Sequence, residues 1–224
     1  MLARIRSAAL AGIDAYPVDV EVDISPGLPS FSTVGLPHGA VKEGRERVSA
    51  ALTNAGFEFP LRRITVNLAP ADIRKDGSAF DLPIALGLLL ASGQLAAPSL
   101  ANTCVVGEVG LEGDLRPVRG ALSMALAARS AGSAGLLLPQ ASVAEAAVVA
   151  GLEVRGVRTL LEACAHLDGT RVLAPTRVDV ARIMAERLGE AADFSDVRSQ
   201  PAAKRALEVA AAGAHNILTL RCRD

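Results

Sequence analysis

The chain has 224 residues, of which half are hydrophobic and 21% are charged, so it has room for a sizeable core in one large or two small domains. Its 23 basic and 24 acidic residues give a formal net charge of −1, which excludes a globally basic nucleic-acid coat protein. Aromatic residues make up 3% of the chain and Trp is absent, which argues against a base-stacking platform or an aromatic sugar-binding groove.

The cysteines and histidines are scattered. Cys104, Cys164 and Cys222 stand far apart and form no C-x-x-C pair, and no histidine has a second ligand three or four residues further on. We therefore expect no metal site and no disulfide framework, and a reducing cytoplasm as the location.

Two stretches bear on targeting and membranes. The first ten residues carry Arg4 and Arg6 without a long apolar run, so we expect no signal peptide. Residues 82–107 lack charge, but polar residues and prolines leave a dense apolar block from Ile84 to Ala91. That length is typical of a buried core helix, so we expect no membrane contact and a cytoplasmic protein.

The first third of the chain predicts strands over residues 3–13, 16–24 and 30–34. In the second of these, apolar and acidic residues alternate, which is typical of an antiparallel strand with one buried face. The inward set is Val18, Val20, Val22 and Ile24, and the outward set is Asp19, Glu21 and Asp23.

A helix is predicted over residues 41–55, ended by Gly56. Its inward residues are Val41, Val48, Ala51 and Leu52, and its outward residues are Lys42, Glu43, Arg45, Glu46 and Arg47.

Helices and strands then alternate. The pattern predicts strands at 64–68, 135–138 and 152–154, helices at 82–92, 119–131, 143–150 and 159–166, and a hairpin of 105–109 with 113–115 around Gly110. Strands followed by alternating helices and strands indicate a mixed α/β (α+β) fold, with a mixed sheet covered by helices.

The C-terminal part predicts a helix over 201–212 and a strand over 216–220, and such a pair cannot bury its own apolar faces. We therefore expect a first domain over residues 1–168, a linker over 169–192, and the start of a second, incomplete domain over 193–224.

Several motifs together resemble the YifB/ComM family of Mg-chelatase-like AAA+ ATPases. The resemblance extends over nearly the whole chain, up to Leu220. It is carried by residues 29–37, 41–48, 64–72 (ITVNLAPAD), 75–85 (KDGSAFDLPIA), 107–108, 113–120 and 193–216.

The resemblance implies a ChlI-type N-terminal domain with the ribosomal protein S5 domain 2-like fold, as in the Lon protease domain, followed by an AAA+ module. It also implies that the full-length family binds ATP and Mg²⁺ and forms homo-oligomers. ComM-type members are hexameric DNA branch-migration helicases of natural transformation, which makes DNA the implied partner. An alternative is a metal-chelatase-associated ATPase subunit.

The phosphate loop of that ATPase module is missing from the sequence. A Walker A loop, Gly-x-x-x-x-Gly-Lys-Ser/Thr, holds nucleotide phosphates through backbone N–H groups and its Lys, and no such motif occurs here. Val197 and Gln200 match the adenine side of the family's nucleotide site, with Ser199 where the family usually has Gly. We therefore expect a truncated or frameshifted product without a bound cofactor, unable to hydrolyse ATP. The alternative is a small family member with another phosphate site.

The segment from Lys75 to Ala79 corresponds to the nucleophile loop of Lon-type proteases, which use a Ser–Lys pair. Aligning the Asp-Gly pairs puts Ala79 at the nucleophile and Ser78 one position early. In the helix that begins at Arg119 and should supply the base, Leu122 occupies the position of the Lys. We therefore expect no catalytic residue, and a Lon-like serine peptidase is the disfavoured alternative.

A local basic patch is the candidate nucleic-acid site. Arg62, Arg63, Arg74 and Lys75 flank one strand and are expected to converge at one sheet edge, while Lys42 and Arg45 add a basic helix face. Such a patch would bind DNA phosphates without sequence preference. The alternative is an ordinary solvated surface.

Overall fold

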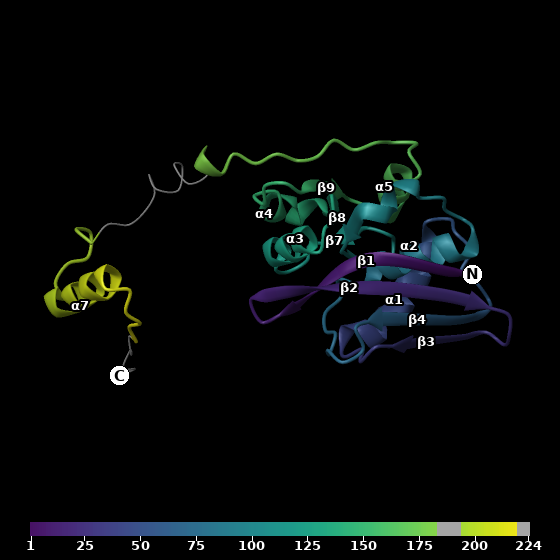
Figure 1. The fold of residues 1–224 in the computed structure, drawn as a ribbon, viewed down its shortest axis with the longest axis horizontal. Helices are drawn as coiled ribbons and strands as arrows, with labels where there is room; N and C mark the ends of the chain where they lie inside the picture. The colour runs from purple at the N-terminus through teal and green to yellow at the C-terminus, as the bar shows by residue number, and fades with distance from the viewer. Residues whose placement is uncertain (183–193, 219–224) are drawn as a thin grey trace. The chain divides into compact units, whose positions relative to one another are not determined.

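A computed structural model describes residues 1–182 and 194–218. The chain divides into two units, Met1–Val178 and Asp179–Asp224 (Figure 1). The first unit is a mixed α/β domain, as the sequence predicts.

The first unit is built on a seven-stranded mixed sheet in the order β3-β4-β2-β1-β5-β8-β9. Its strands are β1 (Leu2–Ala11), β2 (Asp14–Ser25), β3 (Ser30–Val34), β4 (Arg63–Ala69), β5 (Thr103–Val105), β8 (Gly135–Pro139) and β9 (Glu153–Val157). The β1–β2 and β2–β4 pairs are antiparallel, and the other neighbouring pairs are parallel. A separate hairpin joins β6 (Glu108–Val109) to β7 (Leu115–Arg116).

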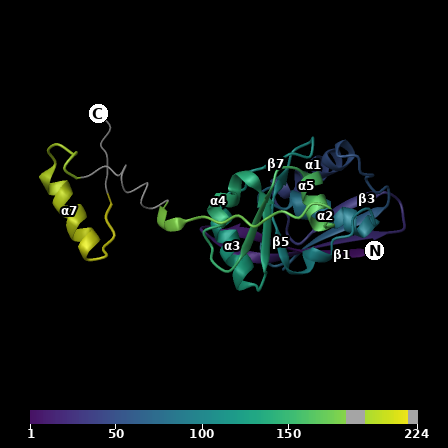
Figure 2. The same ribbon diagram turned by 90° about the horizontal axis from the view of Figure 1, so that it is seen from above.

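The helices of this unit are α1 (Ala40–Asn54), α2 (Asp81–Ser92), α3 (Ala121–Ser130), α4 (Val143–Ala146) and α5 (Leu160–Leu167). Two 3₁₀ turns, η1 (Pro98–Asn102) and η2 (Gln140–Ser142), connect elements. Seen from above, α1, α2 and α5 lie toward one end of the unit and α3 and α4 toward the other (Figure 2).

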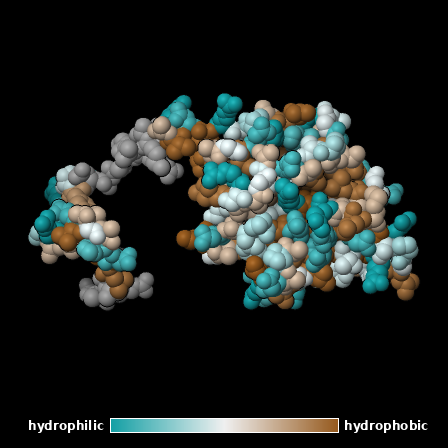
Figure 3. Space-filling model, viewed as in Figure 1, coloured by the Kyte–Doolittle hydropathy of each residue, from teal (hydrophilic) through white to brown (hydrophobic). Residues whose placement is uncertain are grey.

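Hydrophobic burial explains the strongest sequence predictions. The alternating strand is β2, and Val18, Val20, Val22 and Ile24 are all buried, as expected. The apolar block is α2, which contacts β1 and β2 and is buried at nearly every position. Among the described helices, none is long and apolar enough to cross a membrane. Hydrophilic and hydrophobic side chains are mixed on the face of the first unit in Figure 3.

Three predicted elements differ from the structure. The segment 105–109 is divided, because β5 joins the main sheet before the chain turns away to form β6. The helix predicted over 143–150 ends at Ala146. Residues 216–218 form no strand, and the rest of that predicted strand lies outside the described residues.

The first unit continues beyond the predicted boundary at residue 168. Leu173 packs against the core, and its carbonyl accepts a hydrogen bond from Arg155 Nε at 3.0 Å. The amide of Thr176 donates to the carbonyl of Val154 at 2.8 Å. The start of the predicted linker is therefore held along β9.

In the second unit, α7 (Pro201–Ala212) has the predicted bounds, and none of its residues is buried. The part of the predicted linker beyond Arg182, residues 183–192, lies outside the described residues.

An ion pair joins α1 to the start of α2. Arg47 was predicted to point outward, but its side chain is only 21% exposed and binds Asp81, which is 2% exposed. Nε and Nη2 of Arg47 donate to the two carboxylate oxygens of Asp81 at 2.7 and 3.0 Å. Nη2 also donates to the carbonyl of Ala40 at 2.8 Å. The sequence prediction was wrong here because a helix pattern cannot reveal a buried carboxylate on another element.

We predict that Asp81 gives the protein an unusual pH dependence. Burial raises its pKa from 3.8 to about 6, although Arg47 acts in the opposite direction. The folded state therefore holds this proton more tightly than the unfolded state. The contribution of Asp81 to stability should be complete below pH 3.8 and should be lost as the pH rises through 6, a loss of about 3 kcal/mol.

Urea unfolding of the wild type and Asp81→Asn between pH 4 and 7 tests this. The wild type should lose stability relative to Asp81→Asn as the pH rises. The exposed control Asp14→Asn should follow the wild type. Parallel pH profiles for the wild type and Asp81→Asn would show that the pKa is not raised.

Candidate functional site

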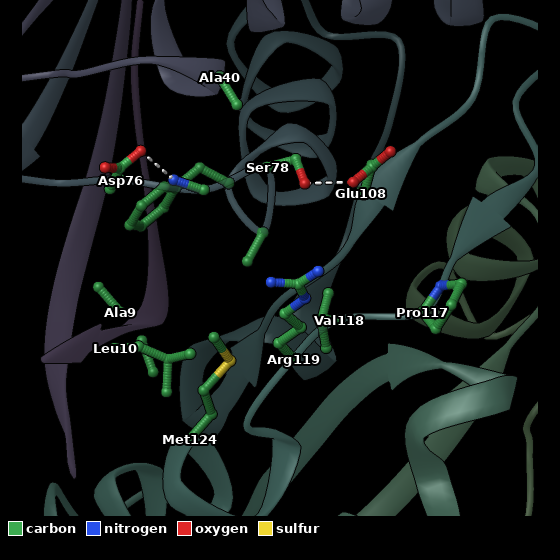
Figure 4. A pocket seen from close by; sticks show the side chains of 14 residues that line it. Ala9, Leu10, Ala40, Asp76, Ser78, Glu108, Pro117, Val118, Arg119 and Met124 are labelled. Atoms are coloured by element: carbon green, nitrogen blue, oxygen red, sulfur yellow. Dashed lines mark hydrogen bonds between the residues drawn. The ribbon is translucent and has the colours of Figure 1, made fainter. Parts of the chain in front are cut away.

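A pocket of about 370 Å³ lies where three segments of the first unit meet (Figure 4). These segments are the end of β1, the loop before α2, and the stretch that leads into α3, and Ala40 of α1 and Glu108 of β6 complete the lining. The apolar lining includes Ala8, Ala9, Leu10, Val118 and Met124, and the polar lining is Asp76, Ser78, Glu108 and Arg119.

Backbone hydrogen bonds place the loop before α2 beside the residue before β6. The amide of Gly107 donates to the carbonyl of Ala79 at 2.8 Å, and the amide of Leu82 donates to the carbonyl of Gly107 at 2.9 Å. As a result, Ser78 and Glu108 face one another, and the Ser78 hydroxyl donates to Oε2 of Glu108 (Figure 4).

The two acidic residues at the pocket each have a cation nearby. Oε1 of Glu108 lies 3.7 Å from Nη1 of Arg116. Oδ2 of Asp76 lies 3.5 Å from Nδ1 of His38 and 3.9 Å from Nη2 of Arg74.

Arg119 is the polar residue of the pocket without such compensation. Its side chain is exposed, and its guanidinium points toward the Ser78–Glu108 pair in Figure 4. Across the described ranges it has no hydrogen bond or ion pair. The pocket therefore combines an apolar wall with one cation that no protein group neutralises.

The pocket lacks the lysine base that a Lon-type peptidase would need, since no lysine is among its lining residues. Leu122, which the resemblance aligns with the protease's base, does not line it and is 38% exposed. Ala79, at the position of the nucleophile, does line it. Ser78 has Glu108 as its neighbour instead, and a carboxylate is a weak base toward a serine hydroxyl.

Lys75 does not belong to an exposed basic patch, because its side chain is fully buried. Within the described part of the molecule, its ammonium has no hydrogen-bond partner. Burial lowers its pKa, and Asp72 partly opposes this effect. A buried ammonium cannot contact a DNA backbone.

The other candidate DNA residues do not converge at one edge. Arg62 lies just before β4 and Arg63 is its first residue, whereas Arg74 follows the other end of the strand and contacts His38. Lys42 is exposed on the first turn of α1. Arg45 lies over the Phe31 ring and 3.8 Å from Glu46.

The residues assigned to the adenine side lie in the second unit. Val197 is 41% exposed. Ser199 and Gln200 both have left-handed backbone conformations, with φ of 63° and 61°, which glycine adopts more readily than other residues. Ser199 thus occupies a conformation suited to the Gly that the family resemblance implies at this position.

Cys104 and Cys164 are free and buried, and burial raises the pKa of each thiol to about 12. They behave as small core residues. Cys222 lies outside the described residues.

The sequence analysis missed Glu108 and Arg119 as pocket residues. Glu108 is the first residue of β6 and Arg119 lies in the turn before α3, and neither lies in a catalytic motif. The GE pair at 107–108 is part of the family resemblance, and that signal could have directed attention to Glu108.

Two family models match the chain in sequence order. Residues 20–142 match subunit ChlI of Mg-chelatase, and residues 193–221 match magnesium chelatase, subunit ChlI.

Curated relatives match almost the whole chain. Protein YifB of Salmonella typhimurium is 43% identical over 220 residues, which is 98% of this chain and 42% of that protein. Competence protein ComM of Haemophilus influenzae is 42% identical over 221 residues, 98% of this chain and 43% of that protein. The chain thus spans less than half the length of these relatives.

A more distant match is consistent with the Lon-like fold expected from the sequence. Lon protease 1 of Sorangium cellulosum is 30% identical over 179 residues, which is 73% of this chain and 22% of that protein. Together, the family models and the relatives show that the chain belongs to the YifB/ComM family of Mg-chelatase-like proteins.

Proposed function

We propose that the first unit is an accessory N-terminal domain of a ComM-type AAA+ ATPase, a hexameric DNA branch-migration helicase in natural transformation. The observation that carries this proposal is the match to competence protein ComM over 98% of the chain. In that setting ATP, Mg²⁺ and further copies of the chain are the partners of the full-length protein.

Arg62 and Arg63 are the best supported DNA contacts. Both are exposed, and their side chains have no ion-pair or hydrogen-bond partner among residues 1–182 and 194–218. A phosphate can therefore bind them without breaking an existing pair, whereas Arg74 would have to leave His38.

The residues present do not fit the phosphates of ATP. The lysines are Lys42, Lys75 and Lys204, and none follows a glycine-rich loop. Lys75 is buried, while Lys204 lies in α7. We therefore assign no step of ATP chemistry to these 224 residues.

Two other functions have less support. A serine peptidase would need a base stronger than Glu108 beside Ser78. A chelatase-associated ATPase subunit would share the ATP requirement, but the ComM match favours a DNA motor.

We predict that Arg62→Gln/Arg63→Gln weakens binding to duplex DNA by about threefold to tenfold and lowers the salt slope by roughly one to two, since two phosphate contacts are lost. Fluorescence anisotropy at several salt concentrations measures both. Arg74→Gln is the matched control and should have a smaller effect. Equal affinities for the wild type and the double variant would show that Arg62 and Arg63 do not contact DNA.

We predict that Ser78 does not react as a nucleophile. A serine-directed fluorophosphonate should leave the chain unlabelled from pH 6 to 9, because no lysine reaches the Ser78 hydroxyl to take its proton. Mass spectrometry after one hour measures this, with a known serine peptidase as the positive control. Stoichiometric labelling that disappears in Ser78→Ala would contradict this prediction and support a peptidase function.

We predict that millimolar ATP with Mg²⁺ does not raise the melting temperature of the 224-residue chain, because a phosphate loop contributes most nucleotide contacts in this class. A chain extended through a family ATPase module is the control and should be stabilised. Stabilisation of the short chain by several degrees would indicate another phosphate site.

A further inference from the structure

We propose that the pocket between β1, α2 and α3 binds a carboxylate that carries an aliphatic group, with Arg119 as the carboxylate's partner. Such a ligand is either a small free acid or the C-terminal residue of a peptide. The proposal concerns a site separate from Arg62 and Arg63, and it does not depend on DNA or ATP.

The charges of the pocket favour one negative charge on the ligand. Glu108 is compensated by Arg116 and by the Ser78 hydroxyl, and Asp76 is compensated by Arg74. Arg119 remains without a partner within the described residues. Its planar guanidinium can donate two parallel hydrogen bonds to a carboxylate.

The lining favours an aliphatic group next to that charge. Ala8, Ala9, Leu10, Val118 and Met124 supply apolar surface on the side of β1 and α3. A volume of about 370 Å³ lies within the range of small-ligand pockets and accommodates a side chain of leucine size.

The wall beside Arg119 is held firmly in place. Leu10 packs closely over Gly120, where a Cβ atom would lie 2.6 Å from Leu10 Cδ2. The amide of Val118 donates to Ser142 Oγ at 3.0 Å. The pocket is thus formed before a ligand enters, which reduces the entropy cost of binding.

A ligand-observed NMR titration of the full 224-residue chain tests the proposal with four probes. These are N-acetyl-leucine, the peptide acetyl-Ala-Ala-Leu, and the C-terminal amide of each. Both acids should bind, and both amides should bind at least about tenfold more weakly, because a charge-assisted pair contributes on that order.

Variants distinguish the effect of the Arg119 charge on binding from an effect on folding. Arg119→Gln should weaken the acids about tenfold or more and so remove the preference over the amides. Arg177→Gln, a change at an exposed arginine outside the pocket, should alter neither. Glu108→Gln should tighten acid binding, because it removes a negative charge next to the site. Melting temperatures near that of the wild type confirm that the variants fold.

The relative affinities identify the source of the carboxylate. A peptide that binds at least about tenfold more tightly than N-acetyl-leucine supports a peptide C-terminus, and equal affinities support a free acid. Equal binding of acids and amides overturns the proposal. Unchanged acid binding by Arg119→Gln, or displacement of the acid by an equal concentration of inorganic phosphate, overturns it as well.

Discussion

The buried ion pair between Arg47 and Asp81 fixes the arrangement on which the pocket depends. Asp81 is the first residue of α2, and its carboxylate is almost wholly buried, so it requires a close partner. Arg47 supplies two hydrogen bonds and binds the carbonyl of Ala40 as well, which ties the start of α1 to the start of α2. Gly44 leaves room for this contact, because a Cβ atom there would lie 2.8 Å from Oδ1 of Asp81. The loop that carries Ser78 therefore enters α2 at a fixed position.

The sequence predicted those parts of the fold in which burial follows a simple period. The alternating residues of β2 and the apolar run of α2 have their side chains where the pattern indicated. The division of 105–109 between two sheets could not be read in the same way. A single short apolar run there contains the end of β5 and all of β6. The hydrogen bonds of each strand to its own partner strand decide where β5 ends and β6 begins.

The candidate site was predictable only in part, because its residues converge from distant segments. Ser78 attracted attention through its protease-like loop, but its partner Glu108 lies 30 positions further along the chain. The opposite error occurred at Lys75, which reads as a surface cation in the sequence although its side chain is buried. The local sequence pattern shows which side chains could take part in a reaction or bind a ligand, whereas tertiary packing determines which of them lie close together.

The order of strands in the sheet has a consequence for how the chain acquires its structure during synthesis. β1 and β2 are neighbours in sequence and can form a hairpin early, but the other edge of β1 meets β5, with Arg6 opposite Cys104. Contacts of such long sequence separation close slowly. Until β5, β8 and β9 have left the ribosome, the apolar surfaces of β1 and α2 are incompletely covered. A partly synthesised domain therefore exposes apolar surface that the finished sheet covers, and such surface favours aggregation.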